Sequence, residues 1–498
     1  MFQFRHLYIS KHPILGSINI DFSINETDSE KSGVSTSVII GKNGIGKSYI
    51  LRAIIDIFRV AEILKETNDA FNSLKIDYKF KISYLLNDSL YEFTNIRPLE
   101  IVSFNAPEIW SCKINNKDVS LKELQLPYKI IASSMTITDK FPTPSVGRYC
   151  YRGVRNERTP STTGTRTLVR KVVDGIIDSF SKKTTTTDDL CNLLKNLDLK
   201  SKIEIRYKIR YKDIFLTGNQ SQESLKDIYT NWRKYFPDRS GEVWGTKFFH
   251  GIQNNSNKLQ IICDYLNRCA ANCNIGKYPI VYDVFSEENT LIQDAEAIKL
   301  LSNLDILTFP EIKVWKQTHK HGYEFVNSSS GETQQLCQFI NVMSAINQDS
   351  LILIDEPENS SHPNWQIKFI EWLPKIFADY RSCHFIIATH SHFLLSDLNP
   401  QWSSIIALTK DDNNHIKNIA EDINTFCWST DDILYRIFQV RNTRNYVFES
   451  QMMRLYHLIE DNNGNRAEIV RLVEELSRYR LNDDDPLNEL LKYAELHA

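Results

Sequence analysis

The chain has 498 residues, of which 42% are hydrophobic and 24% charged, a composition that supports a sizeable core and excludes wholesale disorder. The 59 lysines and arginines face 62 acids, and the net charge of −3 excludes a globally basic nucleic-acid coat but not a local basic patch. No apolar run approaches the roughly 20 residues that span a bilayer, and the first residues lack a signal-peptide pattern. We therefore expect a cytoplasmic protein that has no membrane partner.

The nine cysteines are scattered along the chain and indicate no disulfide framework. The tightest group, Cys263, Cys269 and Cys273, lacks the paired spacing that is typical of a zinc site.

Alternation of apolar residues predicts short β-strands at residues 2–10, 18–22 and 36–40. A helix is expected from residue 48, because Leu51, Ile54, Ile55 and Phe58 recur at helical spacing. Further strands are predicted at residues 76–86, 91–95, 100–104 and 129–133. Helices are predicted at 224–235, at 259–269 and over roughly the last seventy residues. The absence of a long heptad array in the sequence excludes an extended coiled-coil arm.

Two basic stretches lie in the middle of the chain. Residues 143–183 are rich in Ser, Thr and Gly and predict a mobile basic loop, for which contact with phosphates and a solvated surface are equally good interpretations. Residues 202–212 alternate apolar and charged side chains, and we favour an edge strand that lysines protect against aggregation over a nucleic-acid surface. The arginines of the first stretch are Arg148, Arg152, Arg155, Arg158, Arg166 and Arg170.

Residues 41–48, Gly-Lys-Asn-Gly-Ile-Gly-Lys-Ser, fit the phosphate-loop pattern G-x-x-x-x-G-K-[ST] completely, between an apolar strand and a helix. Glycines let successive backbone N–H groups point inward, and the helix N-terminus adds partial positive charge. Lys47 would reach the β- and γ-phosphates of ATP, and the Ser48 hydroxyl would ligate Mg²⁺. The predicted nucleotide-binding residues of this loop are Gly41, Asn43, Gly44, Gly46, Lys47 and Ser48.

A second motif follows much later in the chain, where an apolar strand at residues 350–354 ends in Asp355 and Glu356. Two buried carboxylates without partners would be costly, so a purely structural role explains them poorly. Asp355 is placed to hold Mg²⁺, and Glu356 is placed to polarise the attacking water.

Three weaker elements surround this strand. Residues 328–332, Ser-Ser-Ser-Gly-Glu, precede a predicted helix, and Ser and Gly at a helix N-terminus can donate hydrogen bonds to a phosphate. A second buried strand at residues 385–388 is followed by Thr389 and His390. Residues 358–363 follow Glu356 at the place where a subunit-contacting loop is expected.

Together, residues 41–48, 329–332, 351–356 and 389–391 resemble the ABC-type ATPases of the SMC and RecF group. The resemblance implies an α/β P-loop ATPase head, two copies of which sandwich ATP. His390 would be the switch histidine that senses the γ-phosphate, and it would join Glu356 and Lys47 as a catalytic residue. The signature residues, which would act on the nucleotide of the other subunit, are Ser329, Ser330, Gly331 and Glu332.

The sequence departs from that family in two places. Ser330 stands where the ideal signature has a glycine. The glutamine of the family's Q-loop is not identifiable, although residues 133–141 occupy about the right place.

Three functions are compatible with such a head. Fusion to a TOPRIM nuclease is disfavoured, because the roughly 100 residues after His390 are largely helical and their acids do not follow buried strands. The second function is that of a RecF- or SMC-like ATPase of DNA repair, or of a DNA clamp without a dedicated nuclease partner. We keep it as the alternative to the function described next.

The third function is anti-phage defence, since residues 131–142, 148–155 and 428–438 are similar to the PtuA-type ATPases of Septu and certain retron systems. The resemblance implies ATP-dependent head dimers or higher homo-oligomers that regulate an HNH nuclease of the PtuB type. In retrons a reverse transcriptase and its multicopy single-stranded DNA join them. This chain carries neither an HNH nor a reverse-transcriptase motif, so nucleic-acid contact would be local or through a partner.

Roughly 300 residues separate Lys47 from Asp355, so one head must be assembled from both sides of an insertion. We expect the first part of the head at residues 1–180 and an inserted mixed α/β and helical region at 181–300. The second part of the head, with the signature, the acidic strand end and the switch histidine, is expected at 301–425, and a helical region at 426–498.

Overall fold

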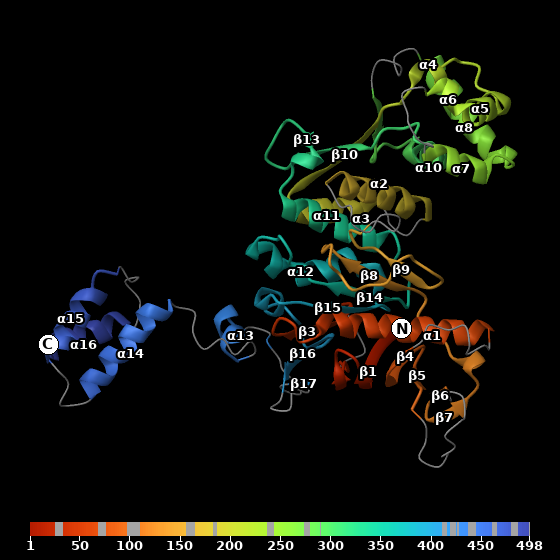
Figure 1. Cartoon of the computed structure of the whole chain (residues 1–498). Coiled ribbons are helices and arrows are strands. Elements are labelled where there is room, and N and C mark those ends of the chain that lie inside the picture. Colours follow the sequence, from red (N-terminus) through yellow and green to blue (C-terminus); the bar gives the residue numbers. More distant parts are fainter. Residues whose placement is uncertain are drawn as a thin grey trace. The chain divides into compact units, whose positions relative to one another are not determined.

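The computed structural model describes most of the chain and divides it into two compact units, Met1–Trp428 and Ser429–Ala498 (Figure 1). Among the described residues, no helix has both the length and the apolar character needed to cross a bilayer. The described residues are 1–24, 33–67, 76–96, 110–155, 165–182, 187–236, 244–272, 279–288, 290–410, 416–418, 425, 428–436, 445–460, 466–479 and 487–497.

A mostly parallel sheet forms the centre of the first unit. Its strands are β3 (Ser35–Gly41), β8 (Ile130–Ser134), β9 (Tyr149–Tyr151), β14 (Leu351–Asp355), β15 (His384–Ala388), β16 (Ser403–Lys410) and β17 (Ile416–Asn418). In the described part of the chain their order is β17-β16-β3-β15-β14-β8-β9, and only β17 runs antiparallel to its neighbour. Strand β3 lies between β15 and β16, so strands that are distant in sequence alternate within one sheet.

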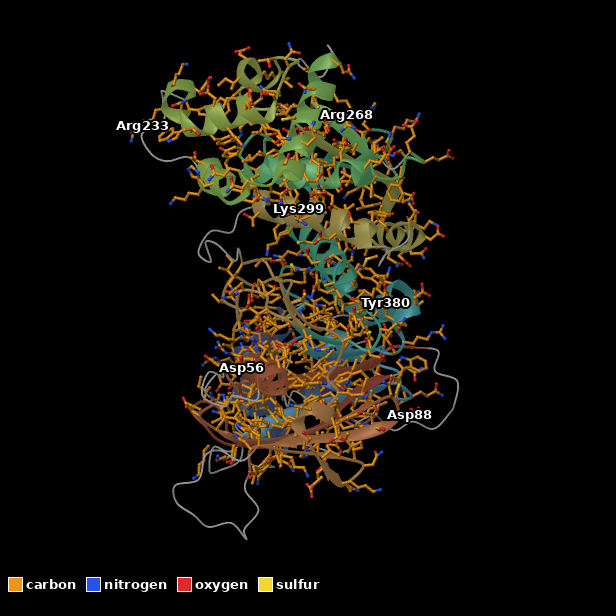
Figure 2. The ribbon with its side chains drawn as sticks, turned by 90° about the vertical axis from the view of Figure 1, so that its right-hand side faces the viewer. Asp56, Asp88, Arg233, Arg268, Lys299 and Tyr380 are labelled. Atoms are coloured by element: carbon orange, nitrogen blue, oxygen red, sulfur yellow. The ribbon has the colours of Figure 1, made fainter. Side chains whose placement is uncertain are left out.

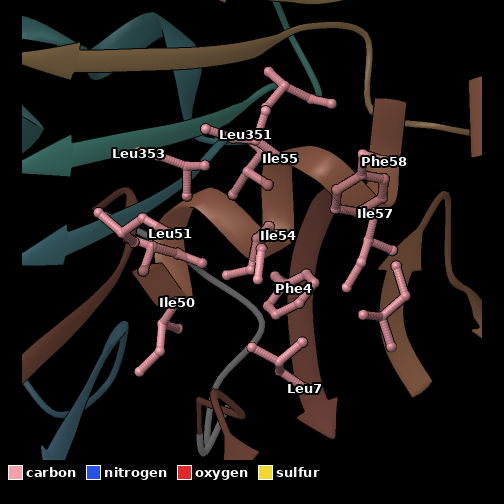
Figure 3. Close-up of a cluster of buried hydrophobic side chains, with 14 of the residues drawn as sticks. Phe4, Leu7, Ile50, Leu51, Ile54, Ile55, Ile57, Phe58, Leu351 and Leu353 are labelled. Atoms are coloured by element: carbon pink, nitrogen blue, oxygen red, sulfur yellow. The ribbon is translucent and has the colours of Figure 1, made fainter. Parts of the chain in front are cut away.

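The helix α1 (Lys47–Thr67) packs between this sheet and a second, antiparallel one. It is apolar almost all round, as expected of a helix covered on two sides. Figure 3 shows its buried side chains between Phe4 and Leu7 of one sheet and Leu351 and Leu353 of the other. The second sheet has the order β2-β1-β4-β5-β6-β7. Its strands are β1 (Phe2–His12), β2 (Gly16–Asp21), β4 (Lys79–Leu86), β5 (Ser89–Thr94), β6 (Ser111–Ile114) and β7 (Lys117–Val119). The short helix η1 (Leu121–Glu123) follows β7. The strand predicted at residues 100–104 lies outside the described residues.

The helices α11 (Ser330–Met343) and α12 (Pro363–Ile376) lie on the side of the parallel sheet opposite α1 (Figure 1). Both follow motif segments, the signature and the loop after β14 respectively. The remaining short helices of this part are η2 (Phe325–Asn327), η3 (Ala378–Tyr380) and η4 (His392–Leu395).

The elements between β9 and η2 form an α/β insertion into the head. Its four-stranded sheet has the order β11-β10-β12-β13. Within the insertion, Asp178 forms an ion pair of 3.0 Å with Lys299, and Figure 2 labels Lys299. The strands are β10 (Leu199–Tyr207), β11 (Ile280–Asp283), β12 (Glu311–Lys316) and β13 (Tyr323–Glu324). The helices are α2 (Thr165–Lys182), α3 (Thr187–Asn196), α4 (Lys212–Phe215), α5 (Gln222–Thr230), α6 (Trp232–Tyr235), α7 (Trp244–Ile252), α8 (Ser256–Ala271), α9 (Thr290–Gln293) and α10 (Ala295–Asn303).

The prediction of an edge strand at residues 202–212 is wrong. Strand β10 pairs with β11 on one side and with β12 on the other, and it ends at Tyr207. Two of its cationic side chains pair with Glu204, Lys202 at 3.5 Å and Arg206 at 2.8 Å, and Lys208, just after the strand, pairs with Glu311 at 3.5 Å. Alternating polarity shows only that one face of an antiparallel strand is solvated, and an interior strand satisfies that condition as well as an edge strand.

The prediction of a mobile basic loop at residues 143–183 is also wrong for those residues of the stretch that the structure describes. Residues 149–151 form β9, and helix α2 occupies most of the second half of the stretch. Arg170 lies on α2, Arg158 lies outside the described residues, and Arg155 makes a largely buried ion pair.

The second unit is helical, with α13 (Thr430–Arg436), α14 (Tyr446–Glu460), α15 (Arg466–Leu476) and α16 (Leu487–His497). It has an apolar core of its own, formed by Met452, Leu455, Ile469, Leu472, Val473, Leu476, Leu491 and Ala494. The predicted α/β class is therefore confirmed: a mostly parallel sheet that carries the phosphate loop, with a nested α/β insertion and a helical C-terminal region.

Candidate functional site

Three strand ends meet at one edge of the parallel sheet. In the ladder, Asp355 of β14 lies beside Ala388 of β15, which in turn lies beside Ile39 of β3. The segments that follow these strands are the phosphate loop, Glu356 and the Thr389–His390 pair. Parallel strands end on the same edge of a sheet. Motifs that are hundreds of residues apart in the chain therefore become neighbours in space.

The phosphate loop wraps around its own lysine. Gly44 and Gly46 have φ values of 78° and 104°, which side chains rarely adopt, and a Cβ on Gly46 would lie 2.4 Å from Leu15 Cδ2. Lys47 Nζ donates to the carbonyl oxygen of Gly41 at 2.8 Å. Asn43 is exposed at the crest of the loop. The loop therefore holds the ammonium of Lys47 at its centre.

Ser48 and Asp355 form the pair of oxygens that suits a divalent cation. The Ser48 hydroxyl donates to Asp355 Oδ1 at 3.1 Å. Burial raises the pKa of Asp355 to about 7, and the nearby charges of Glu356 and Asp139 act in the same direction. A cation at this place would relieve that unfavourable burial of negative charge. Ser48 and Asp355 supply two oxygen ligands, and Mg²⁺ ordinarily takes its other ligands from phosphates and water.

His390 bridges the lysine and the second acid. Its Nδ1 lies 3.0 Å from Lys47 Nζ, and its Nε2 lies 3.6 Å from Glu356 Oε1. A lysine ammonium has only donors, so Nδ1 accepts and Nε2 carries the proton. Burial, reinforced by Lys47, lowers the pKa of His390 to about 4, so the ring is neutral at pH 7. Glu356 has a φ of 51°, a strained backbone conformation that is common at functional sites.

The contacts of Glu358 are not apparent from the sequence, which places this acid only in a loop expected to contact another subunit. Glu358 Oε1 accepts the backbone N–H of His390 at 2.7 Å, and Glu358 has the largest electrostatic effect of any acid on the pKa of Lys47. The available signal was a third acid directly after the strand, in the run Asp-Glu-Pro-Glu.

The signature segment is not brought to the phosphate loop of its own chain. Ser329 caps α11 in a reciprocal capping box with Glu332, whose carboxylate also pairs with Lys316 at 2.9 Å. A Cβ on Gly331 would lie 2.9 Å from the carbonyl oxygen of Ser360, so the helix start packs closely on the loop after β14. Ser329 and Ser330 are exposed. Within the described ranges, no hydrogen bond or ion pair joins residues 329–332 to residues 41–48.

The segment at the expected Q-loop position contains a buried ion pair. Arg155 Nη2 lies 2.6 Å from Asp139 Oδ1, its Nε donates to Oδ2 at 3.0 Å, and the Tyr151 hydroxyl donates to the same oxygen at 2.8 Å. The Asp139 side chain is fully buried. Arg155 is therefore committed to the protein interior and is not available to bind phosphates.

Replacing Arg155 by alanine is expected to lower the melting temperature by several degrees. The variant leaves the buried carboxylate of Asp139 without its cation, which costs about 3–5 kcal/mol. Thermal unfolding followed by circular dichroism measures the effect. Arg170→Ala is the control, because the Arg170 side chain is 39% exposed and lies 3.6 Å from the 53% exposed side chain of Asp174, a pair worth less than about 1 kcal/mol. Equal melting temperatures for the two variants would contradict the prediction.

Raising the pH above about 8 is expected to weaken ATP binding. Burial lowers the pKa of Lys47 to about 8, whereas bound phosphates would favour its charged form. The nucleotide-free protein thus loses the proton first, and above pH 8 the Kd should rise by up to about tenfold per pH unit. Nucleotide titrations between pH 6 and 10 test this. Lys47→Arg keeps its charge and should abolish the dependence, and a flat wild-type profile would contradict it.

Comparison with solved structures finds weak overall similarity to ATPase heads. The Smc head domain of Pyrococcus furiosus, with an extended coiled coil and bound to the C-terminal domain of ScpA, is 13% identical with a TM-score of 0.32, covering 84% of this chain and 97% of that chain. The SMC head domain from Thermotoga maritima is 10% identical with a TM-score of 0.31, covering 84% and 100% respectively. The recombination mediator protein RecF of the RecFOR pathway is 14% identical with a TM-score of 0.27, covering 84% and 98%.

No curated protein matches the chain in sequence. A family model described as the AAA ATPase domain matches residues 15–395, a range that begins before the phosphate loop and ends after His390. Because this match covers more than half of the chain, the protein belongs to the AAA ATPase domain family.

Proposed function

We propose that the chain binds ATP together with Mg²⁺ and hydrolyses it at the edge of the parallel sheet. The observation that carries this proposal is the meeting of Lys47, Asp355 and His390, from three different strand ends, around one site. Residues 41–48 would bind the phosphates through backbone N–H groups and the Lys47 ammonium. Ser48 and Asp355 would hold Mg²⁺, which when bound neutralises charge on the β- and γ-phosphates.

The remaining side chains would handle the attacking water. Glu356 would accept its proton, and the Nε2–H group of neutral His390 would donate a hydrogen bond on the same side of the site. In the nucleotide-free arrangement Lys47 is bonded to His390 Nδ1. Binding of phosphates to Lys47 would therefore free His390 to reorient, which couples nucleotide binding to the switch histidine.

We further propose that two heads close on ATP, with the signature of one chain completing the site of the other. Ser329 and Ser330 support this, since they are exposed at the start of a 14-residue helix and are held by the loop after β14. Their hydroxyl and amide groups are thus presented to an outside phosphate.

Beyond ATP hydrolysis, we propose that the chain regulates an HNH nuclease of the PtuB type in an anti-phage complex. The three sequence runs that resemble PtuA support this function, as does a C-terminal helical unit with a core of its own, suited to docking a partner. A RecF- or SMC-like role in DNA repair, without a nuclease partner, uses the same head chemistry and is the second candidate. The weak structural similarities do not separate the two.

Co-expression with the neighbouring reading frames tests the choice between the two functions. For the defence function we expect an adjacent HNH gene product to co-purify with the chain, and phage plating to fall only when both proteins are present and Lys47 is intact. A reverse transcriptase among the neighbours would indicate a retron. Protection from DNA damage without any effect on phage plating would favour the repair function.

A further inference from the structure

Glu358 is an acid whose carboxyl group is buried in the site and is not explained by binding of phosphate or metal. Its Oε1 accepts the backbone N–H of His390 at 2.7 Å, while its Oε2 is buried and has no hydrogen-bond partner among the described residues. Burial raises the pKa of this carboxyl group, and hydrogen bonds from the backbone N–H groups of His390 and Glu358 and from the Thr389 side chain oppose the shift. A buried carboxylate with one unsatisfied oxygen costs stability, so its contacts need an explanation beyond folding.

Glu358 lies where the backbone of the switch segment leaves the sheet. The Thr389 N–H still donates to the carbonyl oxygen of Ile39 at 3.0 Å, as a continuation of the β15 ladder. One residue later the ladder ends, and the N–H of His390 is bonded to Glu358. On the far side, Ser391 is held by its hydroxyl, which donates to Gln366 at 2.6 Å. Between these two anchors, the backbone of His390 is bonded to Glu358.

The position of the His390 backbone determines where its ring lies. With the N–H of His390 bonded to Glu358, Nδ1 reaches Lys47 at 3.0 Å and Nε2 lies 3.6 Å from Glu356. We propose that Glu358 is a positioning residue of the ATPase site, which holds His390 by this hydrogen bond in register with Lys47 and Glu356. The proposal rests on the hydrolytic function proposed above, but it concerns an arrangement that exists without nucleotide.

Three substitutions separate the hydrogen bond from the side chain as a whole. Glu358→Ala removes the acceptor, Glu358→Asp shortens the side chain by one methylene so that it no longer reaches His390, and Glu358→Gln keeps a carbonyl oxygen at the same length. We expect Glu358→Ala and Glu358→Asp to lower kcat by about 10–100-fold with the ATP Kd changed by less than about threefold. Glu358→Gln should recover most of the rate. Loss of folding would instead lower the melting temperature and affinity together.

A double-mutant cycle with His390→Ala tests whether Glu358 acts through the histidine. If it does, the double variant Glu358→Ala/His390→Ala should have the same kcat as His390→Ala alone. The proposal would be overturned if the double variant lost kcat by the product of the two single losses, or if Glu358→Ala kept the wild-type kcat.

Hydrogen exchange provides a readout that needs no hydrolysis. In nucleotide-free protein, a peptide covering residues 385–395 should exchange the amide of His390 about tenfold faster in Glu358→Ala than in wild type, and near the wild-type rate in Glu358→Gln. Unchanged exchange in Glu358→Ala overturns the positioning role even if the wild type proves inactive. Conversely, an inactive wild type that shows the expected exchange would overturn only the hydrolytic function.

Discussion

Replacing Lys47 by alanine is expected to raise the ATP Kd by about 100-fold or more and to abolish ATP turnover. The ammonium of Lys47 lies at the centre of the phosphate loop, where it donates to Gly41 and His390. In the nucleotide complex these bonds would be exchanged for charge-assisted bonds to two phosphates, each worth roughly 1.5–3 kcal/mol. Isothermal titration with ATP and Mg²⁺ measures the affinity directly.

The matched control for this variant is Lys42→Ala. Lys42 belongs to the same loop and carries the same charge, but its side chain is exposed. Its removal should change the Kd by no more than about twofold at physiological salt. A Lys47→Ala protein that binds ATP like the wild type would remove the phosphate-loop assignment.

Stability provides an independent check on Lys47→Ala. Burial lowers the pKa of Lys47 from 10.5 to about 8, so its charged form is less favourable in the folded protein than in the unfolded chain. That cost is fully present below pH 8 and disappears as the pH rises towards 10.5. At pH 7 the variant should therefore melt no lower than the wild type, which separates lost binding from lost folding.

The centre of the site was predictable from sequence because its motifs carry their own local geometry. A glycine-rich loop between an apolar strand and a helix, and a buried strand that ends in Asp355, each specify a backbone shape within a few residues. Parallel pairing then places both at the same sheet edge, whatever the length of chain between them. The apolar spacing of α1 likewise predicted its helix, although not that both of its faces would be covered.

The features that sequence analysis missed depend on pairing between distant residues. Arg155 resembles a solvated arginine until Asp139 is placed beside it, and β10 resembles an edge strand until β11 and β12 arrive from roughly 75 and 110 residues further along. Glu358 follows the strand end as any loop acid might. Its role comes from the N–H of His390, which the β14–β15 register brings to it. Composition and periodicity indicate which face of a strand or helix is exposed. They do not indicate which distant residue or strand lies against it.

Replacing Glu356 by glutamine is expected to lower kcat by about 10²–10⁴-fold while ATP binding is preserved. Glutamine has nearly the same shape as glutamate but is unable to accept the proton of the attacking water. It also leaves the loop, Ser48 and Asp355 in place, so the ATP Kd should stay within about threefold of the wild type. Single-turnover hydrolysis and nucleotide titration measure the two quantities separately.

The same variant should accumulate as a closed dimer, because ATP that is bound and not hydrolysed would keep holding two heads together. Light scattering during size-exclusion chromatography should show dimer for Glu356→Gln with ATP and Mg²⁺, and a smaller species without nucleotide. Glu371→Gln is the control: this acid lies on α12, is about half exposed and pairs only with Lys375 among the described residues, so turnover should be unchanged. Normal turnover in Glu356→Gln would mean that another group accepts the proton. A variant that stays monomeric with ATP bound would contradict the proposal that two heads close face to face on ATP.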